Sequence, residues 1–286
     1  MQILLIGGSG FLGQYIAEEL LSKNHNVTIF DHSSPKESLK DKIKFIKGDI
    51  QNKKKIFQAI KGKQIVYNFA AISDISDAMQ DPINTANVNL LGTLNIIEAC
   101  IRYKIKRFIF ASSVYVLSSQ GGFYKASKQA AELFIDEYNK TYNLNYTILR
   151  YGSIYGRGAD SRNGLSRIIK TALKNNIITY GGTKKAVRNF LHAKDAAVAS
   201  VRILSKNYKN KSILITGSKS IKIINLIKYI KKFLQIDKKV LFKKKPLKGH
   251  YDKNPFTYKS KKTKVMKVTS SVSLDQGIKE ILEEIK

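Results

Sequence analysis

Tyr124 and Lys128 stand four residues apart in the segment Tyr-Lys-Ala-Ser-Lys at 124–128. On a helix this spacing places both side chains on one face. A phenol with an ordinary pKa of about 10 is a poor base near neutral pH, but a nearby ammonium group favours the phenolate. The pair could therefore take a proton from a hydroxyl group and return it, as a general acid–base catalyst does. An exposed helix pair without any chemistry has the same spacing, so this interpretation needs other motifs beside it.

A glycine-rich segment, Gly-Gly-Ser-Gly-Phe-Leu-Gly at 7–13, follows a short apolar run and opens a stretch of helical periodicity. In that context the pattern is typical of dinucleotide binding. Gly7 would make the tight turn, Gly10 would let a pyrophosphate approach the backbone, and Gly13 would let helix and strand pack closely. The alternative is a packing turn that binds no phosphate.

An acidic residue, Asp31, ends the apolar run at 27–30 and stands 18 residues after Gly13. A carboxylate at this place in a dinucleotide-binding fold accepts hydrogen bonds from the adenosine ribose hydroxyls. It would also repel the 2′-phosphate of NADP. The sequence therefore predicts NAD as the cofactor.

Two serines, Ser112 and Ser113, come at the end of a further apolar run at 107–112. In an open parallel sheet, ligands bind at the carboxyl ends of the strands. A serine there could hydrogen-bond a reacting hydroxyl group, although a simple cap of the strand end would look the same.

Strands and helices that could position these residues alternate along the first half of the chain. Apolar runs predict strands at 2–6, 27–30, 43–49, 65–71, 107–112 and 146–150, and helical periodicity predicts helices at 11–23, 52–61, 84–103 and 124–141. Such alternation predicts an α/β fold, a Rossmann-type doubly wound parallel sheet with helices on both faces.

After residue 150 the alternation becomes less regular. The pattern predicts helices at 164–175, 221–234 and 273–285, strands at 177–180 and 212–217, a strand leading into a helix at 188–204, and a Lys/Pro/Gly-rich loop at 243–262. Ser273, with Gln276 three residues later, would cap the last helix. We predict an NAD-binding Rossmann domain over 1–160 and a small C-terminal substrate-binding lobe over 161–286, with 188–205 returning to the first domain.

The composition narrows the class of protein. The net charge is +30, but only eight of the 51 basic residues are Arg, which is the residue preferred for phosphate recognition. The lysines are spread along the chain and lack the aromatic periodicity of a nucleic-acid platform, so compositional drift explains them better than nucleic-acid binding. No apolar run reaches the ~18 residues of a membrane span, and no signal peptide is seen. We expect a cytoplasmic protein without a metal site, in which the single cysteine, Cys100, is a buried apolar residue.

The motifs occur in the order typical of one enzyme family. Further matching segments are Gly48-Asp49, Asn68-Phe69-Ala70-Ala71, Asn89-Leu90-Leu91-Gly92-Thr93, Leu149-Arg150-Tyr151-Gly152 and Arg188-Asn189-Phe190-Leu191-His192. The chain resembles the extended short-chain dehydrogenase/reductase family, in its nucleotide-sugar epimerase/dehydratase branch, and is similar to UDP-glucose 4-epimerases. The likeness spans nearly the whole chain, and it is far more specific for the family than for the reaction.

The resemblance implies a role for each matching residue. NAD would be bound by Gly7, Gly10, Phe11, Leu12, Gly13, Asp31, Asp49, Ile50, Ala70, Ala71, Asn89, Tyr124, Lys128 and Tyr151. Asp49 and Ile50 would contact the adenine, and Ala70 and Ala71 would line the cofactor cleft. Ser113, Tyr124 and Lys128 would be catalytic. Ser113 matches the family's serine better than Ser112, because it stands three residues before Val116. Ser113, Ser153 and Arg188 would bind a nucleotide-diphosphate sugar, with Arg188 on the diphosphate.

Departures from the family pattern also carry information. Dehydratases of the family place Asp-Glu directly after the catalytic Ser or Thr, where this chain has Val114 and Tyr115, so elimination of water is not expected. Ser153 replaces an Asn that contacts the diphosphate in the family. The related 3,5-epimerases need an active-site cysteine, whereas Cys100 lies within a predicted helix.

The resemblance implies a 4-epimerase that oxidises the sugar transiently at C4. Tyr124 would take the proton of the 4-hydroxyl group, Ser113 would orient that oxygen, and hydride would leave to NAD and return on the opposite face. A 4-ketoreductase or 4-dehydrogenase would need the same residues. A non-catalytic NAD-binding regulator on this fold would usually have lost the Tyr124–Lys128 pair. The resemblance also implies a homodimer through the helices at 84–103 and 124–141.

Overall fold

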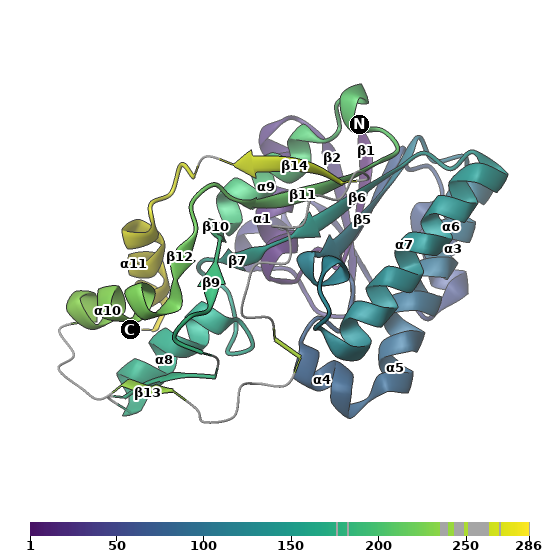
Figure 1. Ribbon diagram of the computed structural model, residues 1–286. Helices are drawn as coiled ribbons and strands as arrows, with labels where there is room; N and C mark the ends of the chain where they lie inside the picture. Colours follow the sequence, from purple (N-terminus) through teal and green to yellow (C-terminus); the bar gives the residue numbers. More distant parts are fainter. Residues whose placement is uncertain are drawn as a thin grey trace.

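The computed structural model describes residues 1–175, 177–181, 183–234, 240–242, 249–250, 263–268 and 270–285 (Figure 1). The strands are β1 (Gln2–Ile6), β2 (Asn26–Asp31), β3 (Lys44–Lys47), β4 (Ile65–Asn68), β5 (Arg107–Ser113), β6 (Tyr146–Tyr151), β7 (Ser153–Tyr155), β8 (Ile178–Tyr180), β9 (Val187–Arg188), β10 (Phe190–His192), β11 (Lys211–Gly217), β12 (Ile221–Lys222), β13 (Val240–Phe242) and β14 (Thr263–Val268). The helices are α1 (Phe11–Ser22), α2 (Glu37–Lys40), α3 (Lys53–Ile60), α4 (Ile75–Gln80), α5 (Pro82–Ala86), the π-helical turn η1 (Asn87–Leu91), α6 (Gly92–Arg102), the 3₁₀ turn η2 (Val114–Leu117), α7 (Gly122–Tyr142), α8 (Gly164–Asn175), α9 (Ala193–Arg202), the 3₁₀ turn η3 (Lys206–Tyr208), α10 (Ile223–Leu234) and α11 (Leu274–Ile285).

Eight parallel strands form the main sheet, in the order β14-β11-β6-β5-β4-β1-β2-β3. The central strands are short and apolar because both of their faces are covered; Ile3, Leu4, Leu5 and Ile6 of β1 are all fully buried. The direction of the strand order changes at β1: β2 and β3 follow on one side of it, and β4, β5 and β6 follow on the other. A doubly wound sheet opens a crevice at the carboxyl ends at this point. The predicted Rossmann-type fold is confirmed.

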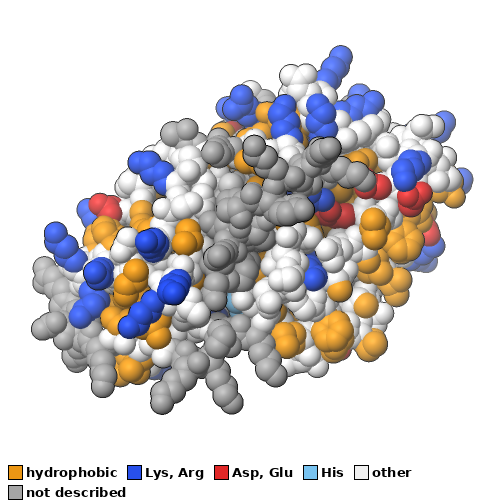
Figure 2. Space-filling view, in the orientation of Figure 1, with side chains coloured by type: hydrophobic (Ala, Val, Ile, Leu, Met, Phe, Trp, Pro, Cys, Tyr) orange, Lys and Arg blue, Asp and Glu red, His pale blue; other side chains and the backbone are white. Residues whose placement is uncertain are grey.

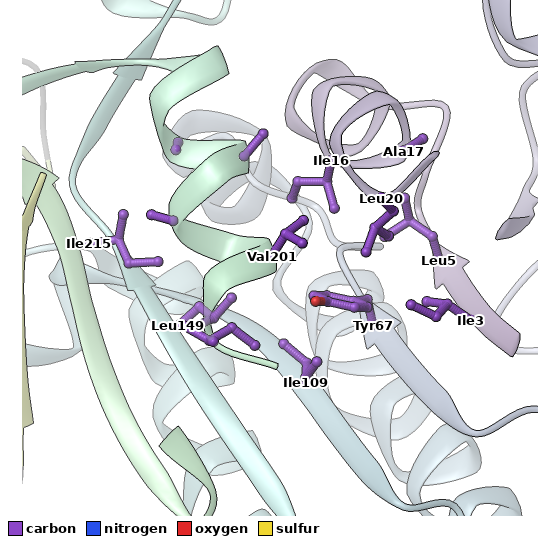
Figure 3. Packing of buried hydrophobic residues seen from close by; sticks show 14 of the residues in the cluster. Ile3, Leu5, Ile16, Ala17, Leu20, Tyr67, Ile109, Leu149, Val201 and Ile215 are labelled. Carbon is purple, nitrogen blue, oxygen red and sulfur yellow. The ribbon is translucent and has the colours of Figure 1, made fainter. Parts of the chain in front are cut away.

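Helices cover the sheet on both faces (Figure 1). On one face, α1 and α9 pack side by side, and Ile16, Leu20 and Val201 meet Tyr67 of β4 (Figure 3). On the other face, α3, α6 and α7 enclose a second apolar layer. Cys100 of α6 lies in that layer, where burial raises the pKa of its thiol, in keeping with the predicted apolar role. In the described residues no helix is long and apolar enough to cross a membrane.

A separate apolar cluster holds the C-terminal elements together. Ile169 of α8, Ile227 of α10 and Ile281 of α11 are buried in it. The predicted cap of the last helix is present, since the Gln276 amide donates to Ser273 Oγ at 3.1 Å. Strands β11 and β14 extend the main sheet instead of joining this cluster, and a boundary between domains at residue 160 stays a prediction. Most of the predicted loop at 243–262 lies outside the described residues.

A buried ion pair ties α7 to the sheet. Glu132 of α7 accepts hydrogen bonds from Arg150 of β6, at 3.0 Å from Nε and 2.5 Å from Nη2. Ser112 Oγ of β5 donates to the same carboxylate at 2.5 Å, and Arg150 Nη1 donates to Thr263 of β14. One carboxylate and one guanidinium group thus connect a helix to three strands.

The burial of this pair predicts an asymmetric response to mutation. Glu132→Gln should lower the free energy of unfolding by about 3–5 kcal/mol, because it leaves a buried guanidinium group without its counter-charge. Glu132→Gln combined with Arg150→Met should cost less than the single change. Glu137→Gln, which breaks the exposed Glu137–Lys140 pair on the same helix, is the control and should change little. Urea titrations measure all three, and a double variant less stable than the single one would contradict this account.

Candidate active site

The turn between β1 and α1 forms a cradle of bare backbone. Gly7 has φ +76, and a Cβ there would lie 2.4 Å from the Ala70 amide nitrogen. A Cβ on Gly13 would lie 2.5 Å from the Gly7 carbonyl oxygen. Gly10 caps α1 without any side-chain hydrogen bond to the first turn. The first-turn amides and the positive end of the helix dipole are therefore available to an anion, as the sequence predicts.

Asp31 ends β2 beside this turn and is 7% exposed. Its Oδ2 accepts from the Ser9 amide at 2.9 Å, and its Oδ1 accepts from the Ser33 amide at 3.0 Å. The nearby cation Lys36 is held by Glu18, with 2.5 Å between Nζ and Oε1. The carboxylate thus lies at the rim of the cradle and is not paired with this lysine.

The residues expected around the adenine and the cleft lie at the carboxyl ends of β3 and β4. Ile50 is buried against Gly92 of α6, where a Cβ would come within 2.6 Å of Ile50 Cδ1. Asp49 is exposed and accepts from the Gln51 amide at 2.8 Å. Ala70 and Ala71 are half-buried, directly after β4. Phe11 and Leu12, also half-buried, open α1.

Asn89 lies in η1, which interrupts the predicted helix at 84–103. Its side chain accepts from the Ile72 amide at 2.8 Å and donates to the Ile72 carbonyl and to Ser127 Oγ, both at 3.0 Å. A π-helical turn inside a helix often marks a functional position. Here it aims Asn89 so that the side chain joins the segment after β4 to α7, the helix that carries Tyr124.

The residues expected at the substrate follow β6 and lie on short strands. Ser153 of β7 is paired with Phe190 of β10. Arg188 of β9 is 9% exposed and pairs with Ile221 of β12. The Tyr151 hydroxyl group lies 2.6 Å from Ser200 Oγ of α9. Because Tyr151 uses its hydroxyl group there, a contact with the cofactor would have to use its ring or backbone.

The predicted catalytic residues meet where β5 ends and α7 begins. Tyr124 is 9% exposed; burial raises the pKa of its phenol, and a hydrogen bond from Ser113 opposes that rise. Lys128 donates from Nζ to the Ala111 carbonyl at 2.9 Å and lies over the Phe110 ring. Burial lowers the pKa of Lys128 to about 8, and the carboxylate of Glu132 opposes this effect.

Two details of this cluster refine the sequence prediction. Ser112 is bound to Glu132, whereas Ser113 bonds Tyr124, so the geometry favours Ser113 as the serine of the site. Glu132 itself was not among the predicted residues, yet it stands four positions after Lys128 on the same helix face. The spacing of four residues between Lys128 and Glu132 could have identified it in the sequence. Its carboxylate raises the pKa of the buried Lys128 against the effect of burial.

Comparison with known proteins identifies the family of the chain. The model of the NAD dependent epimerase/dehydratase family matches residues 3–216. The chain belongs to this family. Its fold, its NAD dependence and its membership of the extended short-chain dehydrogenase/reductase group are thereby established, as the sequence predicts.

Individual relatives of the family cover most or all of the chain. A putative UDP-glucose 4-epimerase of Methanocaldococcus jannaschii is 28% identical, over 99% of this chain and 98% of its own length. A UDP-N-acetyl-alpha-D-glucosaminuronate decarboxylase of Bacillus cytotoxicus is 29% identical, over 77% of this chain and 76% of its own. The solved structure of UDP-glucose 4-epimerase from Thermotoga maritima has a TM-score of 0.87 at 23% identity, over 100% and 98% of the two chains. These relatives catalyse different reactions, so the family alone does not define the activity.

The cradle fits the cofactor of the epimerase/dehydratase family. Ser9 Oγ is buried and has no hydrogen-bond partner among the described residues. A hydroxyl group in this state, next to uncapped helix amides, suits a phosphate oxygen. The glycine turn would hold the pyrophosphate, and Asp31 would hold the adenosine ribose.

Asp31 allows a direct test of this fit. The wild-type chain should bind NAD more than tenfold tighter than NADP, because a 2′-phosphate ~4 Å from a carboxylate is repelled by about 4 kcal/mol at an effective dielectric of ~20. Asp31→Ala should reduce the preference for NAD over NADP, mainly by improving NADP binding. Asp41→Ala, an exposed residue after α2, is the control. If calorimetry found that the wild type binds NAD and NADP equally tightly, the assignment of Asp31 to the cofactor site would be wrong.

Proposed function

We propose that the chain is an NAD-dependent nucleotide-sugar 4-epimerase. The observation that carries this proposal is the buried cluster of Ser113, Tyr124 and Lys128 at the end of β5, a strand that only β4 separates from β1 and its glycine turn. A phenol, a hydroxyl group and an ammonium group at that edge suit the oxidation of a secondary alcohol.

Each residue of the cluster has a defined task in this proposal. Tyr124 takes the proton of the sugar 4-hydroxyl group and later returns it, while Ser113 holds the same oxygen by a hydrogen bond. Lys128, four residues along the same helix, would favour the phenolate by its positive charge. Bound NAD supplies the hydride acceptor and a positively charged ring. Since burial raises the pKa of Tyr124 in the free protein, this second charge is needed to bring the phenol into its working range.

The substrate side of the site supports a nucleotide-diphosphate sugar. Arg188 is a guanidinium group near His250, and such groups bind diphosphates in a bidentate manner. Ser153 would contribute a hydroxyl group beside it. Val114 is buried, and Tyr115 bonds His250. Neither can act as the acid–base carboxylates of a dehydratase, so a reaction that stops at transient oxidation is favoured.

Tyr124→Phe tests the catalytic assignment. The variant should keep its fold and its affinity for NAD, and its turnover should fall about 10²–10⁴-fold, the usual contribution of a positioned proton-transfer group. The assay follows the interconversion of UDP-glucose and UDP-galactose, with Tyr142→Phe at the exposed end of the same helix as the control. Wild-type turnover in the Tyr124 variant would refute the assignment.

The alternative reactions differ in their demand for cofactor. A 4-ketoreductase or 4-dehydrogenase uses up one equivalent of dinucleotide for each sugar, whereas an epimerase regenerates it in every cycle. Turnover by the purified protein without added NAD or NADH therefore supports the epimerase. A strict need for stoichiometric NADH would favour the reductase instead.

We also propose that the chain forms a homodimer through α6 and α7. Hydrophobic side chains gather over α7 (Figure 2), where Leu133 is 67% and Phe134 43% exposed, and Leu91 beside α6 is 52% exposed. An apolar patch of this kind typically marks a protein interface. Light scattering should show a dimer at micromolar concentration.

Charge placed on this surface should separate the two subunits. Leu133→Glu should give a monomer, because a dimer would have to bury the carboxylate. Leu173→Glu on α8, 43% exposed in the wild type, should remain dimeric. A wild-type monomer, or dissociation by both variants, would contradict the proposed interface.

A further inference from the structure

A tyrosine and a histidine from distant parts of the chain meet beside Tyr124. Tyr115, in η2, packs its ring edge-on against the Tyr124 ring, with 6.4 Å between the centroids. On its other side it meets His250, again edge-on, at 6.2 Å. The Tyr115 hydroxyl group and His250 Nδ1 are 3.0 Å apart and share a hydrogen bond. The two rings thus form a wall that extends from the catalytic phenol.

The backbone at Gly249 is shaped to bring His250 to this place. Gly249 has φ +84, a conformation that side chains rarely adopt, and a Cβ there would lie 2.7 Å from Ile75 Cγ2 of α4. The chain therefore passes directly over α4, whose residues Ile75 and Ala78 share an apolar cluster with Tyr124. Tight contact with α4 on one side and the bond to Tyr115 on the other fix the imidazole.

The charges around His250 keep it neutral. Burial lowers the pKa of its imidazole most, the positive charges of Arg188 and Arg167 lower it further, and Asp74 acts in the opposite direction. Tyr115 is a further titratable group in direct contact with it. At neutral pH the wall consequently offers hydrogen-bonding groups without formal charge.

We propose that Tyr115 and His250 are a joint specificity determinant, which binds the hydroxyl groups of a neutral hexose and holds that sugar against Tyr124. The inference rests on the proposed function, because it takes Tyr124 to face the sugar. A neutral phenol–imidazole pair can both donate to and accept from hydroxyl groups. The pair itself carries no positive charge to offset the desolvation of a carboxylate, and Arg188 is assigned to the diphosphate, so a uronic acid should bind less well at this wall.

The test measures binding instead of turnover. Dissociation constants of UDP-glucose, UDP-glucuronate and UDP alone are measured by calorimetry on the NAD-loaded protein at pH 7.5. The wild type should bind UDP-glucose more tightly than UDP-glucuronate. Tyr115→Phe and His250→Asn should each raise the dissociation constant of UDP-glucose about tenfold, the effect of one lost hydrogen bond. The dissociation constant of UDP should stay within about twofold of the wild-type value. Because the two residues act together, the double variant should be little worse than either single one.

Two control variants alter a histidine and a tyrosine outside the proposed wall. His25→Asn alters a histidine before β2, at the opposite edge of the sheet, and Tyr142→Phe alters an exposed phenol; both should bind as the wild type does. If His250→Asn fails to fold, His250→Gln replaces it. If the His250 variant bound UDP and UDP-glucose equally less tightly, His250 would be a diphosphate ligand and the inference would be overturned. Unchanged binding of UDP-glucose, additive effects of the two substitutions, or tighter binding of UDP-glucuronate than of UDP-glucose would also overturn it. If UDP-glucose binding changed as expected but the protein did not catalyse epimerisation, only the proposed reaction would be refuted.

Discussion

Parallel pairing of the strands constrains everything at the site. When β1, β2, β4 and β5 run in the same direction, their carboxyl ends must lie at one edge, and the loops that follow them become neighbours. The register places Ile6 beside Phe30 and Asn68, so the glycine turn, Asp31 and Ala70 follow at the same level. The turn has no room for side chains for the same reason, because the backbone after β4 passes within contact distance of Gly7.

The chemistry depends on keeping charge in a place that water does not reach. Lys128 is buried, and its ammonium group is supported by a carbonyl oxygen, an aromatic face and the carboxylate of Glu132. Glu132 in turn needs Arg150, since one buried charge must be balanced by another. Lys128, four residues after Tyr124 on α7, is therefore linked through Glu132 to a structural ion pair. Glu132 thus influences the protonation of Lys128, although it is not among the predicted site residues.

The sequence was sufficient for the fold and for the parts of the site that depend on local spacing. Apolar runs next to helical periodicity predict the strands and helices of the first half, and the glycine turn and the Tyr124–Lys128 pair follow directly from their spacing. The bonds of Asn89 and Tyr151 were not foreseen, because a side-chain partner 17 or 49 residues away leaves no periodic signal. The pairing of β14 with β11 and the contact of His250 with Tyr115 are likewise products of tertiary packing between segments far apart in the sequence.

The place of β14 has a consequence for the order in which the molecule is assembled. Chains fold from the N-terminus as they are synthesised, and the nucleotide-binding turn draws on residues that all precede residue 72. Arg150, by contrast, also donates to Thr263, and β14 closes the sheet beside β11. The glycine turn and β14 belong to one sheet, so the sheet is complete only after β14 has been synthesised. The ion pair of Glu132 and Arg150 therefore reaches its final surroundings only when nearly the whole chain has left the ribosome.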